Sequence, residues 1–473
     1  MSMRSPVHRP WTRMTTVALS SAAAIAMVAA VSLRSSSAAP AERGLTFSNA
    51  SGVHRTIALT GAIDTGNPFF QELGTNGRTC FSCHRPAEAW SITPEELSAR
   101  FAATDGLDPV FRTNDGSNCE GADVSTLAAR RQAFSLLLAK GLIRIALEVP
   151  QNAEFEVDDV DDPYHCGSVF SSIAAYRRPL PTTNLRFISA VMWDGRQTTP
   201  LGSIHDDLLE QTRDAVTTHA AGAPPSAAQL RDIVEFELGL FTAQVRGNGS
   251  GTLTEPIARG GPEALSHQSF CLGINDPLQM LPAKRGACLK GSSGLDPVVF
   301  TLFNRWLDAD SPERTSIARG ERVFNTRTFV IANVAGLNGG PQDPVQGPIA
   351  SGTCTICHDT PNAGNHSVAM ALNIGLADAA QRTPDLPLYT LRHKVTGEVT
   401  QTTDPGRAMV TGKWADVGKF KGPVLRGLAA RAPYFHNGAA ATLEEALDFY
   451  EKRFQLGLSP EERADLIAFL KSL

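Results

Sequence analysis

Two copies of one short pattern constrain this chain more than any other feature. The first copy spans Cys80–His84 (CFSCH) and the second spans Cys354–His358 (CTICH). Two cysteines three positions apart, followed at once by a histidine, are the pattern for covalent attachment of a c-type haem. A zinc site would need four ligands, usually from two separated pairs, whereas each pair here has its own histidine. The sequence therefore predicts two covalently bound haem c groups.

Each residue of the pattern has a role in that prediction. The two cysteines of a copy form thioethers with the vinyl groups of the porphyrin, and the histidine that follows ligates the iron. The predicted iron ligands are His84 and His358. The predicted attachment residues are Cys80, Cys83, Cys354 and Cys357.

The start of the chain is typical of an exported protein. Arg4, Arg9 and Arg13 precede an Ala-rich apolar run from Met14 to Leu33, and small residues follow the run. Residues 1–41 are therefore predicted to be a signal peptide that directs the chain to the periplasm. The apolar run is long enough to span a membrane, so an uncleaved anchor is the alternative. No membrane span is predicted after signal removal.

The mature chain is predicted to be acidic. Removal of residues 1–41 takes away four arginines and no acidic residue, so the formal charge falls from −5 to −9. This charge argues against nucleic acid as a partner, because binding requires basic side chains that neutralise phosphates. It is compatible with a basic protein partner.

Four cysteines lie outside the two haem patterns. Disulfides are typical of exported proteins, and four cysteines can form two disulfides in three different connectivities. The connectivity that joins near neighbours in the sequence is favoured, and buried thiols are the alternative. The favoured pairs are Cys119–Cys166 and Cys271–Cys288.

The predicted fold class is mainly α, with two c-type cytochrome domains that each place helices around one covalent haem, and with long irregular loops and insertions. A chain of 473 residues is long enough for two domains. The first domain is expected at residues 42–245, with an insertion at about 101–180. An inter-domain excursion at 246–310 then leads to the second domain at 311–473.

Several helices have recognisable signals. Residues 208–219 and 227–244 are predicted to be helices, and in the second segment the apolar residues fall mostly on one face. A capping box at Thr442–Glu445 and a Ser-Pro-Glu start at Ser459 predict the two closing helices. The apolar segment Phe134–Val149 is predicted to be a helix or a strand in the core.

Beyond the haem patterns, the chain resembles the bacterial di-haem cytochrome c peroxidases and the related MauG-type enzymes, which mature methylamine dehydrogenase. The resemblance covers most of the mature chain. It rests on the two haem patterns, on Trp193–Arg196 (WDGR) between them, and on Leu425-Arg426 followed by Ala432–Gly438 (APYFHNG). In that family peroxide reacts at the first haem, and the second haem takes in or stores the second oxidising equivalent.

The resemblance implies a periplasmic oxidoreductase that reduces hydrogen peroxide with electrons from a small redox protein, a cytochrome c or a cupredoxin. The resemblance also allows for a Ca²⁺ ion between the domains as a further cofactor. One alternative is a MauG-like oxidase of a protein or organic substrate. Another is a non-catalytic electron carrier in which both irons have six ligands. Residues 101–180 and 246–295 are longer than the corresponding segments of compact family members. The resemblance therefore does not identify the substrate.

Three residues are candidates for the chemistry at the first haem. Trp193 matches a tryptophan that couples the two haems in the family, with a buried core tryptophan as the alternative. Family peroxidases place a glutamate shortly after a glutamine, but here Gln211 is followed by Asp214, and His219 lies near the glutamate position. His219 is expected to move the proton of peroxide, to ligate the iron, or to be structural.

The second haem has four candidate neighbours. The resemblance puts His436 close to this haem, with a structural turn histidine as the alternative. It also pairs Arg426 with a haem propionate, with a solvated or structural arginine as the alternative. For the sixth iron ligand, family peroxidases use a methionine and MauG-type enzymes a tyrosine from the helix after the His-Asn-Gly turn. Tyr450, fourteen residues past His436, matches that position, and Met409 is the rival. His366, in a polar loop, is expected at the surface.

Overall fold

The structure of the chain, a computed structural model, describes residues 44–167, 170–199, 202–276, 278 and 296–473. The predicted signal peptide and Cys288 lie outside these residues. No helix among them is long and apolar enough to cross a membrane. The helices are α1 (Pro94–Thr104), α2 (Leu127–Ala133), α3 (Ser135–Lys140), α4 (Ile204–Thr218), α5 (Ala227–Leu238), α6 (Gly261–Ser266), α7 (Pro312–Thr326), α8 (Ala408–Thr411), α9 (Leu443–Phe454) and α10 (Pro460–Lys471).

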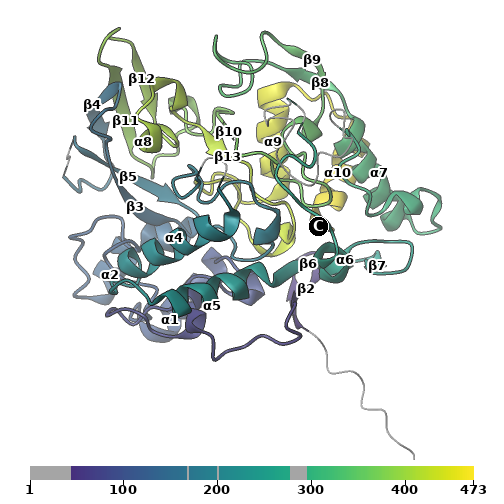
Figure 1. Ribbon diagram of the computed structural model, residues 1–473, viewed down its shortest axis with the longest axis horizontal. Helices are drawn as coiled ribbons and strands as arrows, with labels where there is room; N and C mark the ends of the chain where they lie inside the picture. Colours follow the sequence, from purple (N-terminus) through teal and green to yellow (C-terminus); the bar gives the residue numbers. More distant parts are fainter. Residues whose placement is uncertain (1–43, 168–169, 200–201, 277, 279–295) are drawn as a thin grey trace, which may run out of the picture. The chain divides into compact units, whose positions relative to one another are not determined.

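Short antiparallel sheets accompany the helices (Figure 1). In the described part the strand orders are β1-β2-β6-β7, β12-β11-β4, β3-β5, β8-β9 and β10-β13. The strands are β1 (Leu45–Asn49), β2 (Gly52–Ala58), β3 (Ile143–Glu148), β4 (Phe155–Asp161), β5 (Ser172–Arg177), β6 (Leu240–Gly247), β7 (Gly251–Thr252), β8 (Phe329–Ile331), β9 (Ile349–Gly352), β10 (Ala371–Leu372), β11 (Leu388–His393), β12 (Val399–Thr402) and β13 (Phe420–Lys421).

The expectation of a mainly α fold therefore needs a correction, because strands are more frequent than predicted. The predicted helix at residues 227–244 shows why. Helix α5 ends at Leu238, and the chain continues as β6, which lies between β2 and β7. The first five residues of β6 are all buried, Thr242 and Gln244 included, so no alternation of buried and exposed positions marks the segment as a strand. Such a run looks the same in a buried helix and in a buried strand.

The helix starts that the sequence indicated are confirmed. The Thr442 hydroxyl accepts a hydrogen bond from the amide of Glu445 at the start of α9. Ser459 caps α10 in a reciprocal capping box with Glu462, and Pro460 occupies its first turn. Side-chain oxygens at these positions satisfy amides that have no partner within the helix.

The predicted insertion is linked to the C-terminal part of the chain. Cys119 and Cys166 form a disulfide, as predicted. Strand β4 of the insertion pairs with β11, more than two hundred residues later, and Figure 1 shows β4, β11 and β12 side by side. Because these contacts cross the expected domains, the boundaries near residues 245 and 310 stay predictions.

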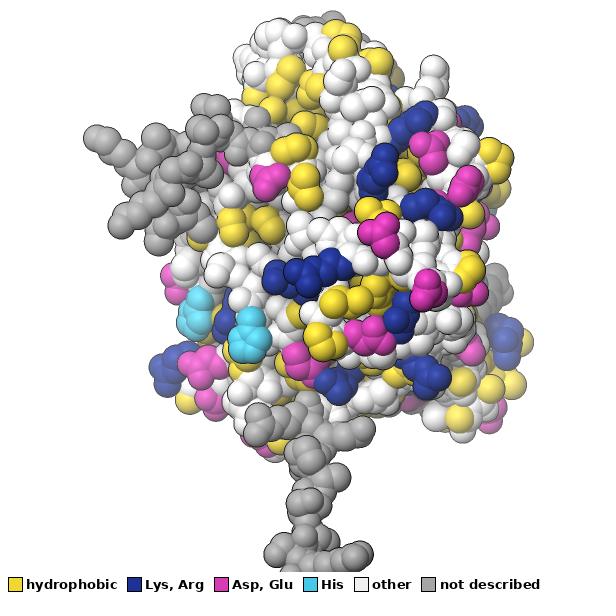
Figure 2. Space-filling view, turned by 90° about the vertical axis from the view of Figure 1, so that its right-hand side faces the viewer, with side chains coloured by type: hydrophobic (Ala, Val, Ile, Leu, Met, Phe, Trp, Pro, Cys, Tyr) yellow, Lys and Arg dark blue, Asp and Glu magenta, His cyan; other side chains and the backbone are white. Residues whose placement is uncertain are grey.

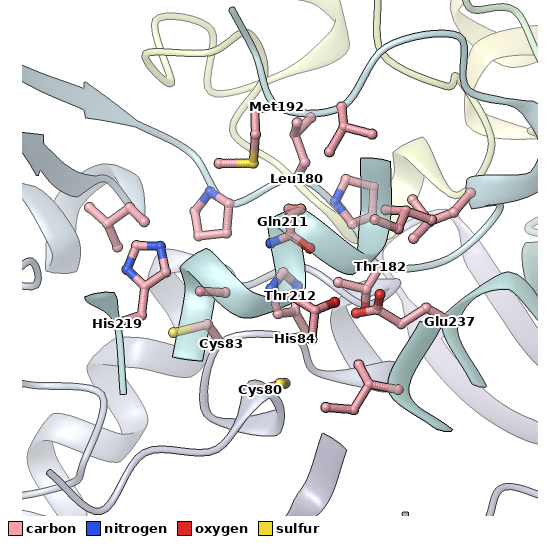
Figure 3. Close-up of a pocket in the computed structure, with 18 of the residues that line it drawn as sticks. Cys80, Cys83, His84, Leu180, Thr182, Met192, Gln211, Thr212, His219 and Glu237 are labelled. Atoms are coloured by element: carbon pink, nitrogen blue, oxygen red, sulfur yellow. The ribbon is translucent and has the colours of Figure 1, made fainter. Parts of the chain in front are cut away.

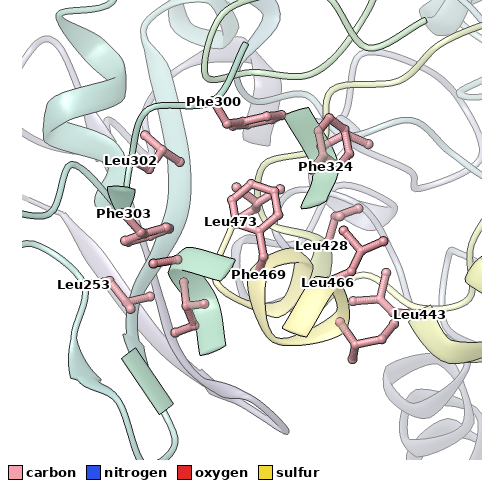
Figure 4. Packing of buried hydrophobic residues seen from close by; sticks show 14 of the residues in the cluster. Leu253, Phe300, Leu302, Phe303, Phe324, Leu428, Leu443, Leu466, Phe469 and Leu473 are labelled. Atoms are coloured by element: carbon pink, nitrogen blue, oxygen red, sulfur yellow. The ribbon is translucent and has the colours of Figure 1, made fainter. Parts of the chain in front are cut away.

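A large hydrophobic cluster surrounds the last two helices. It joins residues of the expected excursion, such as Phe300, to Phe324 of α7 and Phe469 of α10 (Figure 4). The rings of these three phenylalanines make edge-to-face or tilted contacts at 5.1–5.8 Å between centroids. Burial of such apolar area is the main favourable contribution to folding.

Helices α7 and α10 pack against each other at Gly320. A Cβ atom added there would lie 1.9 Å from the carbonyl oxygen of Asp465 in α10, so only glycine allows this approach. Gly320→Ala is expected to lower the free energy of unfolding by about 1–3 kcal/mol through overpacking, although alanine favours a helix by up to about 1 kcal/mol. Denaturant unfolding measures the loss.

Gly121→Ala is the matched control for that substitution. A Cβ atom at Gly121 would meet nothing within 4 Å, so its unfolding midpoint should stay close to that of the unmodified chain. Equal stability of the Gly320→Ala and Gly121→Ala variants would show that the two helices are not packed as described.

Candidate functional site

Both cysteine–histidine patterns adopt the same tight turn. A 3₁₀ turn covers Cys80–Ser82 in the first copy and Cys354–Ile356 in the second. The amide of the histidine that follows donates to the carbonyl of the first cysteine, at 3.0 Å in each copy. The turn therefore brings both cysteines and the histidine of each copy together.

The two histidines are oriented by backbone carbonyls. Nδ1 of His84 lies 3.0 Å from the carbonyl oxygen of Trp90, and Nδ1 of His358 lies 2.6 Å from that of Gly364. A carbonyl only accepts, so Nδ1 carries the proton and Nε2 keeps its lone pair. Burial lowers the pKa of both imidazoles to about 4, against the effect of these hydrogen bonds. Both rings are thus neutral and ready to ligate a metal.

Each turn opens into a large cavity lined mostly by aliphatic and aromatic side chains. The cavity at His84, pocket 1, has an empty volume of about 1450 Å³, and that at His358, pocket 2, about 1730 Å³, open water at the mouths included. The four cysteines of the turns are in no disulfide. Thiols, a neutral imidazole and an apolar cavity of this size fit a covalent haem in each pocket.

Helices α4 and α5 supply several of the polar side chains of pocket 1 (Figure 3). Gln211 and Thr212 come from α4, and His219 follows its last turn. Both Gln211 and His219 thus line the cavity that His84 also lines, which brings the predicted residues of the first site together. Their roles stay predictions.

His219 is held by a carboxylate from the expected insertion. Its Nδ1 lies 2.5 Å from Oδ2 of Asp115, and Arg78 forms an ion pair with the other oxygen of this carboxylate. Burial of Asp115 opposes its ionisation, but the hydrogen bond to His219 and the charge of Arg78 outweigh burial and lower its pKa. Sequence reasoning missed Asp115 and Arg78, because no local pattern connects residues so far apart in the chain.

Glu237 is a second residue of pocket 1 that the sequence did not indicate. Its side chain, near the end of α5, is 4% exposed, and its Oε2 has no hydrogen-bond partner in the described part of the chain. Burial raises the pKa of this carboxyl to about 8. The group is therefore mostly protonated at neutral pH.

Pocket 2 contains one of the two candidates for the sixth ligand. Tyr450 lines it, and burial, with smaller effects of Cys357 and Cys354, raises the pKa of its hydroxyl. Met409 is instead buried in a separate cluster with Phe155 and Leu391. The position of Met409 follows from α8, which packs on the sheet of β4 and β11 rather than beside His358.

Two further histidines line pocket 2. His436 is buried, stacks on Phe420 at 3.9 Å between centroids, and has an unpartnered Nε2 among the described residues. His366 is also buried, with Nδ1 3.3 Å from a carboxylate oxygen of Asp359. The expectation of a surface position for His366 is therefore wrong, because the polar loop that carries it folds inward.

The two pockets have a common wall. Trp193 lines both cavities, as does the segment 178–181. The indole Nε1 donates to the carbonyl of Arg178 at 2.7 Å, and the ring lies edge-on to His436, 6.2 Å between centroids. Trp193 thus lies between the two cavities, and its indole has the structural partner that a core tryptophan needs. Its role in coupling stays a prediction.

Arg426 lines neither pocket and is buried near the carbonyl of Asn362 and the acid Glu321. For Ca²⁺, the described part of the chain contains no group of three or more side chains of the kind that hold a metal. A role for Arg426 at a propionate and a calcium ion both stay predictions.

No family model matches the chain. It is similar to cytochrome-c peroxidase IdrP1 of Pseudomonas sp. (strain SCT), 33% identical over 250 residues, which cover 48% of this chain and 58% of the relative. A cytochrome c551 peroxidase of Nitrosomonas europaea is 43% identical over 76 residues, 16% of this chain and 22% of the relative. The methylamine utilization protein MauG of Methylorubrum extorquens is 43% identical over 65 residues, 11% and 18% of the two chains. The matches span less than two thirds of each relative.

Proposed function

We propose that this chain, which belongs to the superfamily of bacterial di-haem cytochrome c peroxidases and MauG-type enzymes, is a periplasmic oxidoreductase that reduces hydrogen peroxide with electrons from a small redox protein. The observation that supports this most is the wall at Trp193 between two pockets, each with its own cysteine–histidine turn. When bound, the two haems would supply irons that exchange single electrons. Cys80, Cys83 and His84 would hold one haem, and Cys354, Cys357 and His358 the other.

His219 is suited to move a proton in pocket 1. Asp115 is ionised, so it accepts a hydrogen bond from Nδ1–H of His219. The lone pair of Nε2 can then take a proton from the oxygen of peroxide that attacks and return it to the oxygen that leaves. The Gln211 amide, which lines the same pocket, can orient the substrate by a hydrogen bond.

Electrons would enter through pocket 2 and cross the wall at Trp193. The donor is expected to be a small cytochrome c or cupredoxin. On the face shown in Figure 2, positive and negative side chains are interspersed.

Peroxide consumption by the purified holoprotein, with a reduced small cytochrome c as donor, tests this function. Oxidation of about two equivalents of donor per peroxide would support a peroxidase. A protein that reacts with peroxide only when an organic or protein substrate is present would support the oxidase instead. A protein inert to peroxide, with both irons fully low-spin, would support the non-catalytic carrier.

The position of Tyr450 favours the MauG-like oxidase as a second candidate. A tyrosinate ligand would stabilise oxidised iron, whereas a methionine would raise the reduction potential and suit electron entry. Tyr450 lines the cavity of His358 and Met409 does not. Tyr450→Phe is therefore expected to change the absorption and EPR spectra of the second haem only.

Met409→Leu is the matched control, because it changes a buried side chain of similar volume in the other cluster. Its spectra should equal those of the unmodified protein. If Met409→Leu alters the second haem while Tyr450→Phe leaves it intact, the tyrosinate assignment is wrong, and with it most of the case for an oxidase.

A further inference from the structure

Three cations on the pocket walls form no ion pair with an acidic side chain of the described chain. Arg178 is 4% exposed, and Lys421 is 9% exposed. The Nε atom of Arg431 is buried with no hydrogen-bond partner. No carboxylate of the described chain forms an ion pair with any of the three. Buried charges are normally paired, so these cations call for an anion that the described chain does not supply.

The hydrogen bonds of these three side chains bring no negative charge to them. The guanidinium of Arg178 donates only to backbone carbonyls, including that of Ile92 at 2.7 Å. Lys421 Nζ makes no hydrogen bond within the described residues. Burial and then the neighbouring charge of Arg431 lower the pKa of Lys421 to about 8 and that of Arg178 to about 9. The three positive groups therefore oppose one another.

Arg177, the neighbour of Arg178 in the sequence, shows what a satisfied buried arginine looks like here. It binds Asp404 through two nitrogens, at 2.6 and 2.8 Å, and Asp194 at 2.6 Å. The chain thus pairs one arginine with two carboxylates and leaves the next with none. The difference lies in what they face, since Arg178 lines the pockets and Arg177 does not.

The cations also divide between the two pockets in a definite way. Arg178 and Lys421 line both cavities, beside Trp193, whereas Arg431 lines pocket 2 alone. An anion at this wall would therefore be within reach of groups bound in either cavity. Each haem carries two propionate carboxylates, and the thioether and iron ligands hold it in the same cavity.

From this arrangement we propose that Arg178, Lys421 and Arg431 form a carboxylate-binding site in the wall between the pockets, and that haem propionates occupy it. The site links the charge states of the two haems, because two of its cations face both cavities. This inference rests on the proposed function only in requiring that both haems are bound. A solution anion such as phosphate has related chemistry and is the other source that the test must separate.

Spectroelectrochemical titration of the holoprotein, without peroxide, tests the proposal. A positive charge beside a propionate favours the reduced iron. Lys421→Gln is expected to lower the reduction potentials of both haems, and Arg431→Gln that of the second haem only. We expect at least a tenfold change in the equilibrium constant for reduction, which is 59 mV for a one-electron couple. Lys421→Arg should restore both potentials.

Lys413→Gln is the control, since Lys413 is exposed in the same C-terminal segment, and its potentials should not change. Unshifted potentials in both Lys421→Gln and Arg431→Gln, with two haems bound, would overturn the site even if peroxide turnover is normal. Shifted potentials without turnover would leave the site standing and contradict the peroxidase. A saturable effect of inorganic phosphate on the unmodified protein, at constant ionic strength and absent in Lys421→Gln, would assign the site to a solution anion and overturn the propionate proposal.

Discussion

His219→Ala is expected to slow the reaction of the holoprotein with hydrogen peroxide by ~10²-fold or more, which is typical for the loss of a general acid–base group. The imidazole is held by Asp115 through Nδ1, and its Nε2 is left for the substrate. The resting spectrum should stay nearly unchanged, because His84 and not His219 is the expected iron ligand. Stopped-flow absorbance after mixing with peroxide measures the rate.

His205→Ala provides the control for this rate. His205 lies in the first turn of α4, half-exposed, and lines neither pocket, so its loss should not change the reaction with peroxide. Conversion of a low-spin haem to a high-spin one by His219→Ala would show that His219 ligates the iron. An unchanged rate and spectrum would make His219 a structural residue.

Asp404→Ala is expected to lower the free energy of unfolding by about 3–5 kcal/mol, the usual cost of removing one partner of a buried ion pair. Arg177 is fully enclosed between Asp404 and Asp194, and Asp194 also binds Arg196. Loss of Asp404 leaves a buried guanidinium with half of its partners. Asp194 follows Trp193 directly, so the same network fixes the wall between the pockets. Urea unfolding followed by circular dichroism gives the free energy.

Asp158→Ala is the comparison at the surface. Its pair with Arg392 is exposed, and solvent screens such pairs so that they contribute little to stability. Equal losses for Asp404→Ala and Asp158→Ala would contradict the role of the buried network.

The buried network also predicts how stability depends on pH. Burial opposes ionisation of Asp194 and Asp404, but the charge of Arg177 outweighs burial and lowers the pKa of both carboxyls. A carboxyl with a lowered folded-state pKa stabilises the fold fully above its unfolded pKa of about 4, and this contribution is lost as the pH falls from there through the folded-state pKa. The free energy of unfolding of the unmodified protein should therefore decrease below about pH 4. The same decrease should be smaller in the Asp404→Ala variant.

The features that the sequence revealed are local. The cysteines and histidine of each haem turn lie within five residues, and the capping residues of α9 and α10 within four. Their chemistry follows from spacing alone. The position of Tyr450 could also be expected, because one face of a capped helix is fixed by its periodicity.

The features that the sequence did not reveal depend on tertiary contacts. Asp115 reaches His219 across 104 positions, and β4 pairs with β11 through backbone hydrogen bonds that no side-chain pattern records. His366 is buried beside Asp359, an acid seven residues earlier, in a loop whose sequence has no hydrophobic periodicity. The grouping of the unpaired cations Arg178, Lys421 and Arg431 depends on the tertiary structure that forms the two cavities.

The mass of the denatured, purified holoprotein tests the central claim most directly, which is that both cysteine–histidine turns carry covalent haem. The polypeptide should have the mass of the mature chain plus about two haems per chain, and acid-acetone should extract none. Cys80→Ala or Cys354→Ala should each lose or loosen one haem and leave the other in place. A mass equal to that of the bare polypeptide, or haem released by acid-acetone from the unmodified protein, would contradict the claim.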